Sequence, residues 1–104
     1  MYYIHSMLTL VLLLVSCTSM AAGSETVTFP SEDGLLMTAD VYAPYENGEA
    51  PVVVLFHQAG WSRGEYAEIA PWLNTLGYNS MAVDQRSGET VGGVDNETAR
   101  RAAQ

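Results

Sequence analysis

The chain of 104 residues contains no lysine and only four arginines against twelve acidic residues, so its formal net charge is −8. Its one adjacent basic pair is Arg100 and Arg101. Proteins that bind nucleic acid present a basic surface that neutralises the phosphates. This composition cannot build such a surface, and we expect no nucleic-acid partner.

Cysteine is scarce as well, because Cys17 is the single cysteine of the sequence. A disulfide within the chain is therefore excluded, and a folded domain must be held together by its own core. The acidic residues do not show the spacing of metal-binding loops. We expect no metal ion and no cofactor.

Charged side chains are missing altogether from the first 24 residues. Residues 7–15 form an apolar run broken by one threonine, which is long enough for the core of a signal peptide and about half of what a bilayer span requires. Small residues follow it. We predict that residues 1–24 are a signal peptide and that the protein is exported, either to the periplasm or as a membrane-anchored lipoprotein.

Residues 14–17, Leu-Val-Ser-Cys, resemble the lipobox of bacterial lipoproteins, in which the cysteine is lipidated and becomes the new N-terminus. The resemblance implies lipidation of Cys17, and this lipid anchor is the only membrane contact that we expect. The alternative is cleavage of the signal near residues 19–21, which would discard Cys17.

Residues 25–104 alternate between strand and helix patterns. We predict an antiparallel hairpin over 25–29 and 35–42, a strand over 52–56, a helix from Ser62 to Leu76 that Pro71 kinks or splits, a strand over 78–83, and the start of a further helix over 95–104. Residues 52–56 are apolar at every position, which predicts a central strand covered on both faces. The fold class is therefore α/β, a hairpin followed by a βαβ unit.

Two loops carry a family resemblance. His57-Gln58-Ala59-Gly60 ends the apolar strand, and residues 84–88, Asp-Gln-Arg-Ser-Gly, follow the next one. A strand ending in H-G-x-G, a helix, the letters L-G-Y, a strand and then D-x-R-G-x-G resemble the N-terminal half of an α/β-hydrolase, particularly the dienelactone-hydrolase-like and esterase-like branch. The resemblance spans residues 25–104 and departs from the pattern at Gln58 and at Ser87.

The resemblance implies roles for the first loop and a small-molecule acyl substrate. The residue two after the histidine gives its backbone N–H to the oxyanion hole in this family, which places that role on Ala59. His57, Gln58 and Gly60 would position the loop, and we interpret His57 as structural, with a general base as the alternative. Gln58 either directs its amide into the site or is a simple polar loop residue.

Ser62 lies in a G-x-S-x-G pattern, which is the pattern of a nucleophile elbow. Hydrolases of this kind place the triad histidine after the serine, but His5 and His57 are the only histidines and both come earlier. We therefore interpret Ser62 as a helix cap paired with Glu65, and a nucleophile as the alternative. In the second loop, we predict that Asp84 and Arg86 form a structural ion pair or loop anchor.

These observations favour the N-terminal half of an exported serine-type hydrolase for esters or related acyl bonds. The domain would be truncated before its nucleophile elbow, with the remaining catalytic residues after Gln104, and the fragment would be inactive. The sheet would then keep an open edge beside residues 52–56, where copies of the chain could associate. The alternative is a small non-enzymatic exported lipoprotein or binding module that pairs through this edge.

Overall fold

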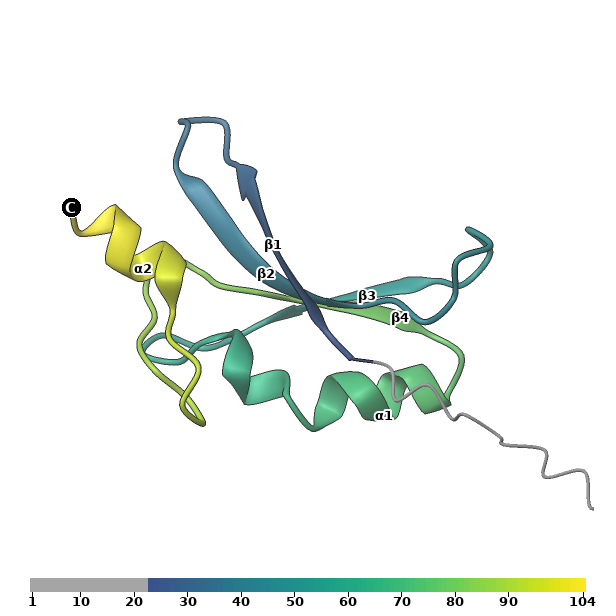
Figure 1. The fold of residues 1–104 in the computed structure, drawn as a ribbon. Helices are drawn as coiled ribbons and strands as arrows, with labels where there is room; N and C mark the ends of the chain where they lie inside the picture. Colours follow the sequence, from purple (N-terminus) through teal and green to yellow (C-terminus); the bar gives the residue numbers. More distant parts are fainter. Residues whose placement is uncertain (1–22) are drawn as a thin grey trace, which may run out of the picture.

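A computed structural model describes residues 23–104. The predicted lipobox with Cys17 lies outside this range, as do residues 1–22 of the predicted signal peptide. The elements are β1 (Glu25–Pro30), β2 (Leu36–Tyr42), β3 (Val52–Phe56), the 3₁₀ helix η1 (Arg63–Tyr66), α1 (Ile69–Thr75), β4 (Asn79–Val83) and α2 (Glu97–Ala102) (Figure 1). The mixed α/β class predicted from the sequence is confirmed.

The four strands form one sheet in the order β1-β2-β4-β3. β1 and β2 are the predicted antiparallel hairpin, β2 is also antiparallel to β4, and β3 runs parallel to β4. The register pairs Val53 with Ser80 and Phe56 with Val83. The carboxyl ends of β3 and β4 therefore lie at the same end of the sheet, where α2 also lies (Figure 1).

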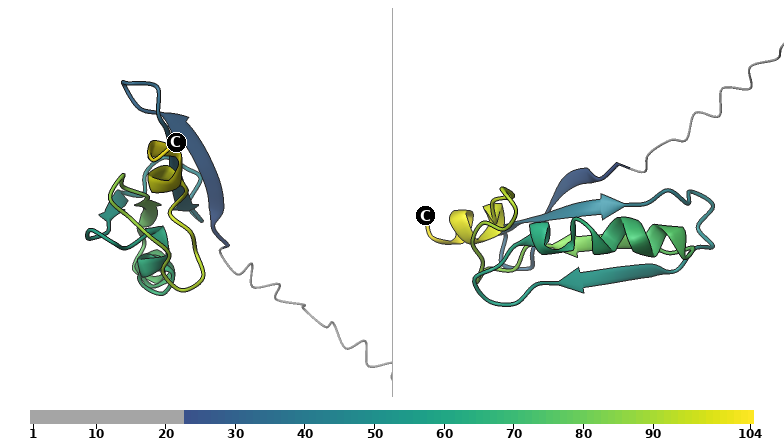
Figure 2. Two further views of the ribbon diagram at one scale, coloured as in Figure 1. Left: turned by 90° about the vertical axis from the view of Figure 1, so that its left-hand side faces the viewer. Right: turned by 90° about the horizontal axis from the view of Figure 1, so that it is seen from below.

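Helices η1 and α1 lie on one face of the sheet, as the view from below in Figure 2 shows. The Ser80 hydroxyl donates to the Ala70 carbonyl oxygen at 3.4 Å, so alternate residues of β4 face α1. The core between the two layers is built from small residues, because Ala70 and Ala82 are fully buried there, whereas Ala39, which pairs with Val83, is fully buried on the opposite face of the sheet. No helix within residues 23–104 is both long enough and apolar enough to cross a bilayer.

β3 has the predicted bounds. It is an edge strand of the described sheet, with β4 on one side only. Val53 and Leu55 are half-buried on the helix-covered side, while Val52, Val54 and Phe56 keep 60%, 42% and 61% of their surface exposed. Residues 23–104 cover only one of the two faces that the apolar pattern predicts to be buried, and they leave one edge of β3 open, as expected for this stretch of the chain.

The predicted helix after Ser62 is two helices. η1 ends at Tyr66 and α1 begins at Ile69, which leaves Pro71 in the first turn of α1, where a missing N–H loses no helical hydrogen bond. The predicted split is confirmed. α1 ends in a Schellman motif, in which Gly77 has φ +92° and the Tyr78 N–H donates to the Leu73 carbonyl at 3.2 Å.

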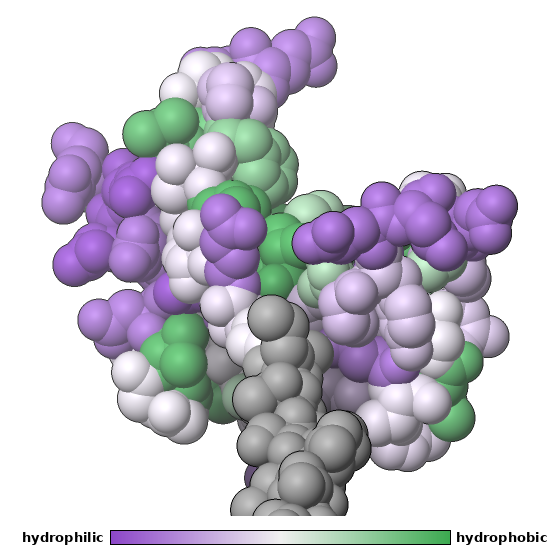
Figure 3. Space-filling model, turned by 45° about the vertical axis from the view of Figure 1, so that its right-hand side comes forward, coloured by the Kyte–Doolittle hydropathy of each residue, from purple (hydrophilic) through white to green (hydrophobic). Residues whose placement is uncertain are grey.

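The turn of the β1–β2 hairpin is polar and projects from the sheet. Ser31, Asp33 and Gly34 form it, and Gly34 has φ +85°, a conformation that favours glycine. Figure 3 shows hydrophilic side chains at the top of the molecule, where this turn lies, and hydrophobic side chains below them along the strands.

α2 closes the end of the sheet beyond β4. Thr98 is fully buried, and its hydroxyl oxygen accepts the Thr38 backbone N–H of β2 at 2.8 Å. The adjacent carbonyl of Thr38 accepts the Asp84 N–H at 2.9 Å. A side chain of α2 thus takes the place of a strand partner where the β2–β4 ladder ends.

We predict that Thr98→Val destabilises the fold by about 1–3 kcal/mol, because the buried Thr38 N–H loses its acceptor while the side-chain volume is kept. Urea unfolding followed by circular dichroism measures the change. Thr98→Ser retains the hydroxyl and is the matched control. Equal midpoints for the valine and serine variants would contradict this role of the hydroxyl.

Candidate functional site

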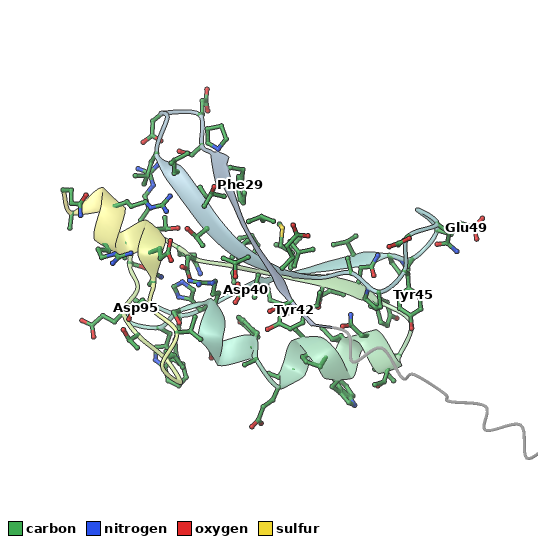
Figure 4. The ribbon with its side chains drawn as sticks, viewed as in Figure 1. Phe29, Asp40, Tyr42, Tyr45, Glu49 and Asp95 are labelled. Carbon is green, nitrogen blue, oxygen red and sulfur yellow. The ribbon has the colours of Figure 1, made fainter. Side chains whose placement is uncertain are left out.

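Three segments meet beyond the carboxyl ends of β3 and β4. They are residues 57–61 after β3, residues 84–91 after β4, and the start of α2 at Asn96. Ligands of α/β sheets bind outside the carboxyl ends of parallel strands, so this end is the candidate site. Figure 4 labels Asp95 at this end and Tyr45 at the opposite end.

Residues 58–61 form a type II turn. The Trp61 N–H donates to the Gln58 carbonyl at 3.1 Å, and Gly60 has φ +80°, which the third position of this turn requires. The Gly60 N–H donates to the Ser87 carbonyl at 2.7 Å. Ala59 is exposed at the second position, and no residue within 23–104 accepts its N–H. This N–H is free to bind a ligand oxygen.

His57 is only 4% exposed and joins the two loops. Its Nδ1 lies 2.7 Å from the Gln58 carbonyl oxygen, and its Nε2 accepts the Gln85 backbone N–H at 2.8 Å. The Gln85 side chain returns a hydrogen bond to the His57 carbonyl. Both ring nitrogens are engaged with the protein, so the geometry supports a structural histidine rather than a general base. The Gln58 side chain is exposed and hydrogen-bonds to none of the residues described.

Asn96 ties the same two loops to α2. Its Oδ1 accepts the Ala99 N–H at 2.7 Å, which caps the helix, while its Nδ2 donates to the carbonyls of Gln85 at 3.0 Å and Trp61 at 3.3 Å. Gly88 packs against this amide so closely that a Cβ there would overlap it. The sequence predicts a cap at the start of the last helix, but the bridging role of Asn96 has no local signal.

A buried ion network lies beneath the loops. The Arg63 guanidinium places Nη1 2.7 Å from Asp84 Oδ2 and Nε 3.0 Å from Asp40 Oδ1, and Nη1 also donates to the Asp95 carbonyl. Asp84 is fully buried and accepts two further backbone N–H groups, from Arg63 at 2.8 Å and from Glu97 at 3.1 Å. Burial acts to lower the pKa of Arg63, but pairing with the two aspartates outweighs it and raises that pKa, so Arg63 stays charged.

The predicted ion pair between Asp84 and Arg86 is wrong. Asp84 lies on the helix-covered side of β4 and pairs with Arg63, whereas Arg86 reaches the hairpin turn and pairs with Asp33 at 2.6 Å. Each residue is nevertheless an anchor, with a partner distant in sequence. Hydrogen bonds from Arg86 and then Ser31 hold the pKa of Asp33 well below its usual range.

Ser62 is fully buried. Its Oγ donates to the Val94 carbonyl at 2.9 Å and accepts the Gly64 N–H at 3.0 Å, which makes it the N-cap of η1. The predicted pairing with Glu65 does not form, because the Ser62 hydroxyl accepts the Gly64 N–H and the Glu65 N–H bonds to the Ser62 carbonyl oxygen. Among residues 23–104 no histidine or carboxylate contacts the Ser62 hydroxyl, so the arrangement of an activated nucleophile is missing there.

An open hollow of about 500 Å³ lies beside the loops, lined by Gly88, Glu89, Thr90, Asp95, Asn96, Ala99 and Arg100. Thr90 donates to Asp95 across it at 2.5 Å. Ala59 does not line it. The described part of the chain contains no group of three or more His, Cys, Asp or Glu side chains that could hold a metal ion.

We predict that Arg63→Met costs about 3–5 kcal/mol of stability, because Asp40 and Asp84 are left buried without a counter-charge. Urea unfolding, followed by tryptophan fluorescence, measures the loss. Arg86→Met is the matched control, and its unfolding midpoint should stay close to that of the parent because the Asp33–Arg86 pair is exposed. Similar midpoints for the two variants would refute the central role of Arg63.

No protein-family model, curated protein or solved structure matches the chain. The functional argument therefore depends on the geometry of this site and on the motifs that form it.

Proposed function

We propose that this chain is the N-terminal part of an exported serine-type α/β-hydrolase domain that cleaves an ester or related acyl bond of a small-molecule substrate. The chain supplies an oxyanion-hole donor and the sheet that positions it. The nucleophile, the acid and the catalytic histidine come from residues after Gln104, and residues 1–104 alone are inactive.

The observation that carries the proposal is the Ala59 N–H. It follows the carboxyl end of β3, stands at an exposed position of a fixed type II turn, and has no acceptor within residues 23–104. Such a donor stabilises the negative charge that develops on a carbonyl oxygen during acyl transfer. The position also matches the family resemblance, in which the residue two after the histidine is the donor.

The sheet topology adds support. An α/β-hydrolase places the strand of residues 78–83 on one side of the strand at 52–56 and a later strand on the other. Here β4 lies on one side of β3, and the other edge of β3 is open in the described sheet. Val52, Val54 and Phe56 are apolar and exposed on the uncovered face, as expected of a strand whose covering elements come later in a chain.

A test begins with the DNA that follows the codon for Gln104. We expect an open frame that encodes a G-x-S-x-G motif and a later histidine. In that longer protein, Ala59→Pro should lower kcat for a p-nitrophenyl ester about 100- to 1,000-fold, because proline suits the second position of a type II turn but has no N–H.

Ala59→Ser is the matched control, because it keeps the N–H and should retain most of the activity. A stop codon directly after Gln104 would contradict the proposal, as would full activity of the proline variant. The 104-residue chain itself should not turn over the ester, and turnover that disappears in Ser62→Ala would restore Ser62 as a nucleophile.

A second function is favoured by the exposure of β3. An uncharged edge strand with Phe56 61% exposed and no lysine, internal proline or bulge can pair with a strand of another molecule. On this proposal the protein is a small exported binding module without enzymatic activity, and it also associates with itself.

The binding module predicts concentration-dependent dimers in light scattering coupled to gel filtration. Val54→Lys should shift the chain to monomer, because a lysine in the middle of the edge strand opposes pairing. Ile69→Lys is the matched control, since Ile69 is similarly exposed but lies on α1. A parent chain that stays monomeric at every concentration tested would refute the self-pairing.

A further inference from the structure

Two nitrogen atoms that carry hydrogen lie within hydrogen-bond distance of one nitrogen of His57. The Gln85 backbone N–H is 2.8 Å from Nε2, and Asn96 Nδ2 is 3.1 Å from it. A backbone N–H can only donate, and the orientation of Asn96 is fixed because its Oδ1 accepts the Ala99 N–H. Nε2 therefore carries no proton, and Nδ1, which faces the Gln58 carbonyl at 2.7 Å, carries the only one.

We propose that His57, Gln85 and Asn96 form a proton-sensitive latch that joins the loop after β3 to the loop after β4 and to α2. A proton added to Nε2 occupies the lone pair that accepts the Gln85 N–H. It also places an N–H against the Asn96 amide nitrogen, 3.1 Å away, whose own hydrogens point to the carbonyls of Gln85 and Trp61. Because His57 and Asn96 are each only 4% exposed, water cannot replace the lost acceptor without opening the loops.

The surroundings of the ring do not compensate a positive charge. The charged groups on the elements packed around it are Arg63 and Glu65 on η1, Asp84, Arg86, Glu89 and Asp95 on the segment after β4, and Glu97, Arg100 and Arg101 on α2. None of them makes a hydrogen bond or ion pair with the imidazole in the described chain. Asp84, the buried carboxylate that directly precedes Gln85 in the sequence, already accepts hydrogen bonds from Arg63 and from the Glu97 N–H.

Opening the latch has a defined structural consequence. Loop 84–88 supplies the Ser87 carbonyl that holds Gly60, and Asn96 caps α2. Release of Gln85 and Asn96 therefore loosens both the turn that carries Ala59 and the docking of α2. The latch rests on these contacts and not on the proposed hydrolase function. If the latch and the proposed hydrolase function are both correct, lowering the pH displaces the Ala59 N–H, the oxyanion donor.

The tautomer is the first test. Nitrogen chemical shifts of the His57 ring, measured by long-range ¹H–¹⁵N correlation on the full 104-residue chain at pH 7.5, should identify Nε2 as the unprotonated nitrogen and Nδ1 as the protonated one. A proton on Nε2 at this pH would overturn the proposal, whatever the behaviour of any variant.

Amide hydrogen exchange between pH 8 and pH 5 is the second test. The protection factor of the Gln85 N–H should fall as the pH is lowered, by at most about tenfold per pH unit because opening takes up one proton, while that of the Asp84 N–H, bonded to Thr38, stays high. His57→Gln keeps an acceptor near the position of Nε2 but does not titrate. Its Gln85 protection should be independent of pH over this range.

Parallel pH profiles for Gln85 in the parent and in His57→Gln would overturn the latch, because a carboxylate elsewhere would then cause the change. If His57→Gln does not fold, the comparison of Gln85 with Asp84 in the parent decides. A simultaneous loss of protection at both amides means global unfolding and contradicts a local latch.

Discussion

The ion pairs of Arg63 determine how the layers of this protein are joined. One guanidinium sits between Asp40 on β2 and Asp84 at the end of β4, while its own backbone begins η1. Asp84 also receives the first N–H of α2. A buried charge without a partner is costly, so these elements must assemble together or not at all. The loops of the candidate site are built on this assembly.

The small size of the apolar core explains why buried polar contacts are important for the stability and specificity of this fold. Its fully buried apolar residues are alanines, and a core of small side chains buries little apolar surface. Specificity then comes from buried hydrogen bonds such as that of Thr98 to the Thr38 N–H. Buried polar groups that are all satisfied define one arrangement, because every alternative leaves a donor or acceptor unpaired.

The sequence pattern was sufficient to predict elements whose structure is determined by neighbouring residues in the chain. Residues 52–56 form a strand with the predicted bounds because five consecutive apolar, mostly β-branched residues favour that state, and Gly77 ends α1 because only glycine tolerates its φ value. Pairings across the chain were not predictable in this way. Arg63 looks like part of a helix start, and only the fold reveals that Asp40 and Asp84 face it. Asn96 likewise shows its capping role in the sequence but not its three bridging contacts.

The two proposed functions place opposite demands on the same edge. A hydrolase domain would cover β3 with a later strand of its own chain, whereas a binding module would cover it with a strand from another molecule. The −8 charge does not decide between them, because β3 itself carries no charge and neither partner strand would meet repulsion there. Ala59 does discriminate. A fixed turn with an unused N–H serves acyl transfer, but strand pairing at β3 makes no use of it. The proposed hydrolase therefore accounts for the free Ala59 N–H, and the proposed binding module does not.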